Sequence, residues 1–276
     1  MPAYARPTRF EDALRILARG DRTVLAGGTD YYPARVGRPL AEDILDVTAL
    51  RELRGITERA DHWRIGATTT WTDVIDADLP PLFDCLKRAA REVGGEQIQN
   101  SGTVAGNVCN ASPAADGVPP LLALDAKVEL SSAGSTRTLP PGDFILGSRK
   151  TARRPDELVS ALLVPKPRYA ACSDFLKLGA RKYLVISIVM VAAVLEHANG
   201  IVRAARVAVG ACSPVARRLS LLEDELIGKQ LGHGLSKCVR PEHLAPLSPI
   251  DDVRGSAGYR SDATLTLVRR LLDHLS

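Results

Sequence analysis

The segment SGTVAGNVCNASPAAD (residues 101–116) is the most informative part of this chain, because it combines glycines with hydroxyl, amide and carboxylate groups. Small residues such as Gly106 let a ligand approach the main chain closely, while Thr103 and Asn107 can hydrogen-bond phosphate and ribose oxygens. Asp116 would repel a phosphate, so its carboxylate suits a ribose or adenine contact better. This combination favours a nucleotide-binding loop.

The wider stretch 94–117 shows no clear helical or strand periodicity. The alternative to a ligand site is an irregular loop packed in the core. Buried irregular backbone needs hydrogen-bond partners, and a long loop without secondary structure of its own is unusual in a compact domain. We therefore interpret this stretch as a functional loop.

A second glycine-rich motif, AGGTD (26–30), lies earlier in the chain and follows the short apolar run TVL (23–25), which predicts a buried strand. A Gly-Gly step permits positive φ and lets consecutive backbone N–H groups converge on an anion. Alone, the motif is equally typical of a plain strand-to-turn junction. A site assembled from both glycine-rich stretches explains why the chain has two of them.

Composition and charge limit the function classes. The chain has 276 residues, 45% of them hydrophobic and 25% charged, which is ordinary for a globular protein of about two domains. A net charge of +4 with only 4% aromatic residues and dispersed arginines argues against nucleic-acid binding. The basic run SRKTARRP (148–155) is interpreted as a solvated loop, with a phosphate or protein contact as the alternative. No stretch approaches the roughly 18–20 apolar residues that span a bilayer.

Neither metal ligands nor catalytic side chains are predicted on this chain. Its five cysteines lie far apart without a C-x-x-C pair, so no metal site is expected. An odd number of cysteines, in a chain whose N-terminus lacks the apolar region of a secretory signal, fits reduced thiols in the cytoplasm. The motifs G-x-G-x-x-G, G-x-x-x-x-G-K-[ST], G-x-S-x-G and H-E-x-x-H are absent from the sequence, and the histidines are isolated.

The order of predicted elements indicates an α+β protein. Thr8 and Glu11 form a capping-box pattern that predicts a helix ending at Gly20. The strand pattern 156–167 ends in two prolines, which predicts a domain boundary. Three antiparallel strands should follow, with Asn199-Gly200 as a hairpin turn, and then two helices.

Three stretches together resemble the FAD-binding medium subunit of the molybdenum hydroxylases, the relatives of xanthine dehydrogenase, carbon monoxide dehydrogenase and 4-hydroxybenzoyl-CoA reductase. They are LAGGTDYYP, QIQNSGTVAGNVCNASPAAD and FLKLGARKYLVISIVMVAAVL. The family typically carries T-[IV]-G-G-N followed by A-S-P-x-x-D. The chain departs from it at Ala105, where relatives often have glycine, and at Tyr31 and Tyr32, where many have an aliphatic pair.

The resemblance implies a two-subdomain FAD-binding domain of the PCMH (vanillyl-alcohol-oxidase) type over residues 1–167, with subdomains at about 1–55 and 56–167. A C-terminal α+β domain of antiparallel strands and helices, of the CO dehydrogenase flavoprotein type, would occupy 168–276. FAD would lie extended between the subdomains, held by both glycine motifs.

Carried over by position, the implied FAD contacts fall in four groups. The first motif would wrap the pyrophosphate and ribityl chain, and the second would bind from the other side, with Asp116 near the adenosine half. Leu163 would border the flavin, and the Lys177 ammonium would approach the isoalloxazine ring. The full set is Leu25, Ala26, Gly27, Gly28, Thr29, Asp30, Tyr31, Thr103, Ala105, Gly106, Asn107, Cys109, Asp116, Leu163 and Lys177.

The function implied by the resemblance is electron transfer in a cytoplasmic complex. A large partner chain would carry the molybdenum cofactor and a small one the [2Fe–2S] clusters, in a heterotrimer or a dimer of heterotrimers. Two alternatives are a free-standing FAD-dependent oxidase or reductase, like the UDP-N-acetylenolpyruvoylglucosamine enzyme, and a scaffold subunit that has lost FAD. The substrate and the terminal acceptor are not encoded in these motifs.

Overall fold

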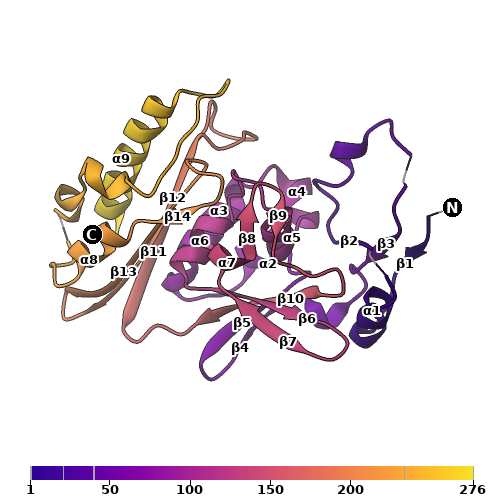
Figure 1. The fold of residues 1–276 in the computed structure, drawn as a ribbon. Coiled ribbons are helices and arrows are strands. Elements are labelled where there is room, and N and C mark those ends of the chain that lie inside the picture. The colour runs from indigo at the N-terminus through magenta and orange to yellow at the C-terminus, as the bar shows by residue number, and fades with distance from the viewer. Residues whose placement is uncertain (1, 21, 40, 233, 276) are drawn as a thin grey trace.

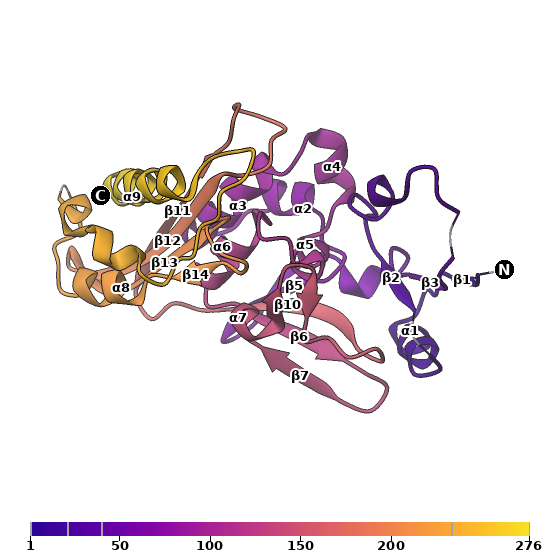
Figure 2. The same cartoon turned by 45° about the horizontal axis from the view of Figure 1, so that its top comes forward.

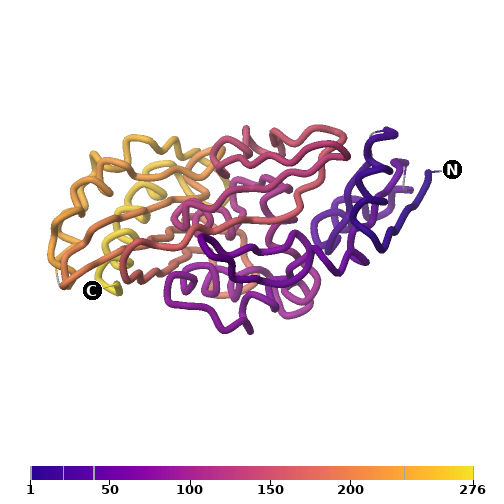
Figure 3. Tube along the Cα trace, turned by 90° about the horizontal axis from the view of Figure 1, so that it is seen from below, coloured from indigo at the N-terminus to yellow at the C-terminus, as the bar shows by residue number. Residues whose placement is uncertain are grey.

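The chain forms a row of three main sheets with helices between and beside them (Figure 1). The computed structural model describes residues 2–20, 22–39, 41–232 and 234–275. The N-terminal sheet lies at one end of the row and the C-terminal sheet at the other, as the chain trace also shows (Figure 3). In the ribbon view, helices of the middle part lie between the central sheet and the C-terminal sheet (Figure 1).

The N-terminal sheet is parallel, with strand order β1-β3-β2. Its elements are β1 (Tyr4–Ala5), α1 (Phe10–Leu17), β2 (Thr23–Leu25), the 3-10 helix η1 (Pro33–Arg35) and β3 (Ile44–Asp46). Ala13, Leu14 and Leu17 of α1 are buried against a small core that includes Leu45 and Leu158. Because Leu158 belongs to the central sheet, this core joins the N-terminal sheet to the middle of the molecule.

The predicted capping box of the first helix is wrong. Helix α1 begins after Arg9, whose side chain makes no capping hydrogen bond, and it ends at Leu17. The amide of Phe10 instead donates to Glu52 Oε1 at 2.6 Å. A residue distant in sequence thus satisfies the first turn, which a local pattern could not reveal.

The central sheet is antiparallel, with strand order β4-β5-β10-β6-β7. Its strands are β4 (Ile56–Glu58), β5 (His62–Gly66), β6 (Lys127–Ser131), β7 (Thr136–Leu139) and β10 (Leu158–Pro165). The helices beside it are α2 (Trp71–Asp76), η3 (Pro81–Phe83), α3 (Asp84–Glu92), α4 (Glu96–Ser101), α5 (Val104–Asn110) and α6 (Val118–Ala123). The remaining short elements are η2 (Arg51–Leu53), α7 (Pro141–Phe144), β8 (Ile145–Gly147) and β9 (Lys150–Thr151).

The stretch 94–117 contains two short helices, α4 and α5, so its description as an irregular loop is wrong. Thr103 is the N-cap of α5, and Ala111 ends this helix in the left-handed conformation with φ of 47°. Only Val104, Ala105 and Val108 of α5 are buried, and no residue of α4 is. Helices this short, with few buried positions, do not show the apolar period that identifies a longer helix.

The C-terminal sheet is antiparallel, with strand order β11-β12-β13-β14. Its elements are β11 (Ala170–Leu178), β12 (Val189–Ala198), β13 (Ile201–Gly210), β14 (Arg217–Arg218), α8 (Ser220–Leu226), η4 (Leu235–Cys238), η5 (Pro241–Leu244) and α9 (Ala257–His274). The predicted hairpin turn is confirmed, since Asn199 and Gly200 both have positive φ, 52° and 72°. Helices α8 and α9 cover one face of the sheet (Figure 2).

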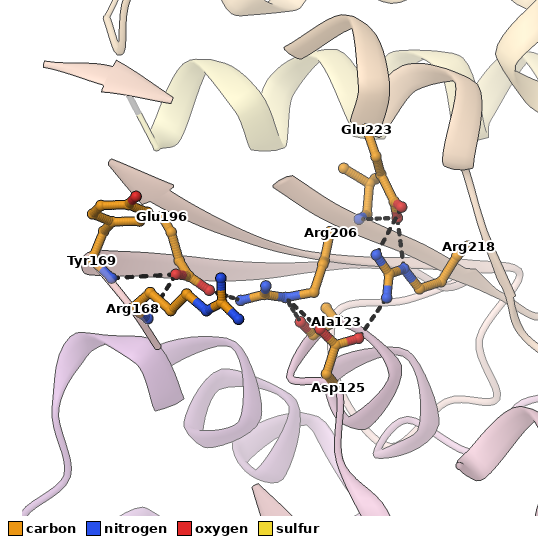
Figure 4. Close-up of polar contacts among 9 residues, drawn as sticks. Ala123, Asp125, Arg168, Tyr169, Glu196, Arg206, Arg218 and Glu223 are labelled. Atoms are coloured by element: carbon orange, nitrogen blue, oxygen red, sulfur yellow. Dashed lines mark hydrogen bonds and ion pairs between the residues drawn. The ribbon is translucent and has the colours of Figure 1, made fainter. Parts of the chain in front are cut away.

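The other face of the C-terminal sheet packs on α3 and α6. Strand β12 is therefore buried on both faces from Val189 to Leu195, which explains its unbroken apolar sequence. Hydrogen bonds and ion pairs also connect the C-terminal sheet to α6 (Figure 4). Arg206 of β13 donates to the Ala123 carbonyl at the end of α6 at 2.7 Å and to Glu196 of β12 at 2.8 Å.

Candidate functional site

A cavity of about 1110 Å³ lies between the N-terminal sheet, the central helices and the connection from β11 to β12. Residues 22–31 form one wall, and 102–116 contribute a second. The β8–β9 connection and the start of β10 add a third, and Leu184, Val185 and Ile186 reach it from the connection between β11 and β12. The structure thus brings both glycine-rich motifs to one cavity, as the sequence predicted.

The two motifs touch each other directly. A Cβ added at Gly27 would lie 1.9 Å from the carbonyl oxygen of Ser101, and one added at Gly102 would lie 3.3 Å from Thr29 Oγ1. Glycine is therefore required at position 27 because the first motif rests on the backbone that joins α4 to α5. This close approach places the main chains of the two motifs side by side at the cavity.

The first motif presents a row of backbone donors. Gly28 has φ of +69°, a conformation that favours glycine. Among the described residues, the amides of Gly27–Tyr31 donate to no protein acceptor. All five residues line the cavity. Consecutive amides without protein partners, beside a glycine with positive φ, are typical of an anion-binding nest.

The second motif is shaped by Thr103. Its hydroxyl accepts a hydrogen bond from the Gly106 amide at 3.0 Å, and a Cβ at Gly106 would lie 2.6 Å from the same oxygen. Asn107 Oδ1 accepts from the Gly117 amide at 3.2 Å. Ala105 is buried with a helical backbone, so the position that departs from the family pattern needs no unusual φ.

Cys109 faces the cavity from the last turn of α5. Its residue remains accessible at this surface, but the surrounding protein raises the pKa of its thiol to about 11. The thiol is therefore protonated at neutral pH, and Cys109 contributes a neutral wall rather than a nucleophile.

The two tyrosines of the first motif have different positions. Tyr31 lines the cavity, its hydroxyl donates to Glu42 Oε1 at 2.9 Å, and the Arg35 guanidinium lies 3.8 Å from its ring centroid. Tyr32 packs over Gly28, because a Cβ at that glycine would lie 2.5 Å from the Tyr32 ring. Tyr31 is thus part of the cavity wall, and Tyr32 supports the turn from outside.

Asp116 lines the cavity from the loop after α5 and is buried. Its carboxylate accepts from Lys177 Nζ at 2.8 Å and from Ser187 Oγ at 2.6 Å. Burial raises the pKa of Asp116, although the Lys177 charge and both hydrogen bonds act in the opposite direction.

Lys177 and Leu163 do not reach the cavity surface. The Lys177 ammonium is turned to Asp116 and to the Glu92 carbonyl at 3.2 Å, so its side chain is buried in the wall. Leu163 lies near the far end of β10, opposite Arg64 and Lys127. Leu158 and Val159, at the start of the same strand, line the cavity instead.

Four arginines at the cavity were not among the predicted contacts: Arg22, Arg35, Arg149 and Arg153. The last two belong to the basic run 148–155, in which Arg149 is exposed and Arg153 half-buried, so the run is solvated but also reaches the cavity. The sequence feature that could have identified Arg149 and Arg153 was the basic run itself, for which a phosphate contact was the alternative interpretation. Arg149 donates to Asn110, and Arg153 Nη1 donates to the Glu157 carbonyl at 2.8 Å, so both side chains are held in place.

In residues 2–20, 22–39, 41–232 and 234–275, no group of three His, Cys, Asp or Glu side chains could hold a metal ion. Over the same ranges, no helix has the length and apolar character needed to cross a bilayer.

Two family models match the chain. The model described as the FAD binding domain in molybdopterin dehydrogenase matches residues 1–167, and the CO dehydrogenase flavoprotein C-terminal domain matches residues 174–275.

Known proteins resemble the chain along its whole length. The xanthine dehydrogenase FAD-binding subunit of Escherichia coli O157:H7 is 30% identical over 275 residues, which is 98% of this chain and 94% of the relative. The glyceraldehyde dehydrogenase medium chain of Sulfolobus acidocaldarius is 30% identical over 272 residues, covering 97% and 96%. A chain of reconstituted CO dehydrogenase from Oligotropha carboxidovorans matches with a TM-score of 0.89 at 27% identity, covering 100% of this chain and 97% of that one.

These matches confirm the predicted fold, an FAD-binding domain followed by a C-terminal α+β domain. A family model matches residues 1–167 of this chain, and a relative is 30% identical over 98% of this chain. This chain therefore belongs to the FAD-binding medium-subunit family of the molybdenum hydroxylases and is an oxidoreductase flavoprotein subunit.

Proposed function

We propose that the chain holds FAD in the cavity between its two glycine motifs and serves as the electron-transfer subunit of a molybdenum hydroxylase. The observation that carries this proposal is the run of amides from Gly27 to Tyr31, which have no protein acceptor in the described chain and line the cavity beside Thr103 and Gly106. A diphosphate is the part of FAD that such a donor row suits.

The residues of the cavity fit FAD in size and charge. A volume of about 1110 Å³ is at the upper end for small-molecule sites, as an extended dinucleotide requires. Arg22, Arg35, Arg149 and Arg153 supply positive charge for the two phosphates. Arg22 Nη1 forms an ion pair with Asp43 Oδ2 at 3.4 Å, while the buried Nε of Arg22 has no hydrogen-bond partner in the described structure and can donate to a ligand.

Each wall then has a distinct task. The amides of Gly27–Tyr31 bind phosphate oxygens, and Thr103 keeps Gly106 close enough for the ligand to approach the main chain. Leu158 and Val159, with Leu184–Ile186, provide apolar surface that excludes water. FAD, when bound, accepts and passes on electrons singly or in pairs. In place of the predicted contact of Leu163 with the flavin, we propose Leu158 and Val159.

The partner chains are inferred from the relatives' names, "medium chain" and "FAD-binding subunit", which describe one chain among several. We infer a large partner carrying the molybdenum cofactor and a small partner carrying [2Fe–2S] clusters, in a heterotrimer or a doubled heterotrimer. The five free cysteines support a reducing, cytoplasmic location for this assembly.

Purification of the complete chain from its native host tests the proposal. We expect the yellow flavin absorption, release of FAD on denaturation, and co-purification of two further chains with molybdenum and iron–sulfur absorption. A yellow chain that reduces or oxidises a substrate without partners would favour a free-standing flavoenzyme. A colourless chain that binds no added FAD would favour a scaffold subunit.

A further inference from the structure

We propose that Asp116 is a positioning residue that fastens both ends of the loop 179–186 and thereby holds this loop over the FAD cavity. The loop connects β11 to β12 and extends beyond the end of their sheet (Figure 2). Lys177 lies just before it and Ser187 just after it, and both donate to the same carboxylate. This inference rests on the proposed binding of FAD in the cavity.

The three side chains form a closed network in the protein interior. Asp116 is 8% exposed and Ser187 is 1% exposed, while the Lys177 side chain is 5% exposed. Lys177 Nζ is bound by one carboxylate oxygen at 2.8 Å and Ser187 Oγ by the other at 2.6 Å, so each end of the loop has its own acceptor. Because the carboxylate belongs to the FAD-binding part of the chain, the network joins the cavity wall to the C-terminal sheet.

The loop between these anchors forms part of the cavity wall. Leu184, Val185 and Ile186 line it. A Cβ added at Gly95 would lie 3.2 Å from Leu184 Cδ2, so the loop packs against the start of α4 across the cavity edge. Tyr183, Leu184 and Ile186 are nevertheless 59%, 57% and 61% exposed, so packing of apolar side chains alone does not fix the loop.

Contacts inside the loop give it shape but do not attach it to the FAD-binding part. Arg181 donates to the Leu184 carbonyl, and Val185 packs on Gly179. The Ile188 amide donates to the Leu178 carbonyl at 2.8 Å, which closes the base of the loop within the C-terminal sheet. The Glu92 carbonyl also accepts from Lys177, at 3.2 Å, but Asp116 is the group that binds both ends of this closed loop and so orients it relative to the cavity.

Substitution of Asp116 separates this role from a contribution to stability. In Asp116→Asn the Lys177 charge loses its counter-charge, and we expect FAD to leave the complete, FAD-loaded chain about tenfold faster, a change of about 1.4 kcal/mol in binding. Trypsin should also cut faster at the exposed residues Arg181 and Lys182. Ser187→Ala, which keeps the ion pair, should move both readouts in the same direction by less.

Two further variants provide controls. Glu196→Gln weakens a similarly buried ion pair with Arg206 at the opposite end of β12, and it should lower the melting temperature without changing loop cleavage or FAD release. The double variant Asp116→Asn with Lys177→Met removes both charges, so melting temperature should recover while cleavage at Arg181 and Lys182 stays fast.

Wild-type rates of cleavage and FAD release in both Asp116→Asn and Ser187→Ala would overturn the inference. So would equal acceleration in Glu196→Gln, since general destabilisation would then explain the effect. If the wild-type chain takes up no FAD, the proposed function fails, but trypsin cleavage of the FAD-free variants still tests whether Asp116 holds the loop.

Discussion

At the scale of single residues, Gly27 has a structural role that its motif alone did not reveal. The resemblance implies a contact between Gly27 and FAD, which a side chain at this position would obstruct. The structure shows that it would first collide with the Ser101 carbonyl, 1.9 Å from the added Cβ. Gly27 therefore holds the two motifs in contact, and the phosphate site depends on that contact.

Gly27→Val should strip FAD from the chain while the C-terminal sheet and helices remain folded. The branched side chain would separate the first motif from the α4–α5 junction and so disperse the row of amides. The ratio of flavin absorbance to protein measures the loss, and circular dichroism measures the fold. Gly142→Ala is the matched control, because its Cβ meets nothing within 4 Å. Full flavin content in Gly27→Val would show that the two-motif site is wrong.

Thr103→Ala should lower the free energy of unfolding by about 1 kcal/mol, because α5 loses its N-cap hydrogen bond to the Gly106 amide. Urea denaturation measures this change. Thr103→Ser keeps the acceptor oxygen and should retain most of the stability. Equal losses in both variants would mean that the Thr103 methyl group, and not the cap, supports the helix.

At the scale of elements, a turn set by adjacent residues was predictable from the sequence, whereas a helix start that depends on a distant residue was not. The Asn199-Gly200 hairpin was predictable because its turn type depends on two adjacent residues. The start of α1 was not, because Glu52 caps it from another element. The helices α4 and α5 were missed since they bury too few residues to leave a period.

The start of β10 is expected to respond to acid. Arg137 of β7 donates to both carboxylate oxygens of Glu157, at 2.6 and 2.9 Å, and holds the pKa of Glu157 below its ordinary value of 4.5. The folded chain binds this proton less readily than the unfolded chain does. The contribution is therefore present above about pH 4.5 and is lost as pH falls through the folded-state pKa.

Urea unfolding at a series of pH values from about 6 to 3 tests this linkage. The free energy of unfolding should fall on acidification, and Glu157→Gln should be less stable at pH 6 but decline less steeply. An unchanged slope in Glu157→Gln would show that other carboxylates account for the acid sensitivity.

At the scale of the whole molecule, a network of charges couples the C-terminal sheet to the central helices (Figure 4). Arg206 joins Glu196 to Asp125 and to the Ala123 carbonyl, and Arg218 joins the same Asp125 to Glu223. Arg206 and Glu196 have side chains only 12% and 7% exposed. Loss of one partner would leave the other charge buried.

Arg206→Met should therefore destabilise the folded chain by about 3–5 kcal/mol, since Glu196 would lose its counter-charge. Arg218→Met should cost less, because the Arg218 side chain is 30% exposed and one of its two partners, Asp125, is 46% exposed. The comparison is made by urea denaturation. A loss in Arg206→Met no larger than that in Arg218→Met would contradict the importance of burial at this contact.

The sequence by itself determined the family, the order of strands and helices in the C-terminal part, and the two motifs that line the cavity, because these depend on residue types at short spacing. Only the tertiary structure decided that Lys177 and Ser187 share Asp116, that Leu158 rather than Leu163 lines the cavity, and that arginines 149 and 153 reach it. Such contacts join residues far apart in the chain. Their geometry depends on how the sheets and helices pack, which no local pattern of residues encodes.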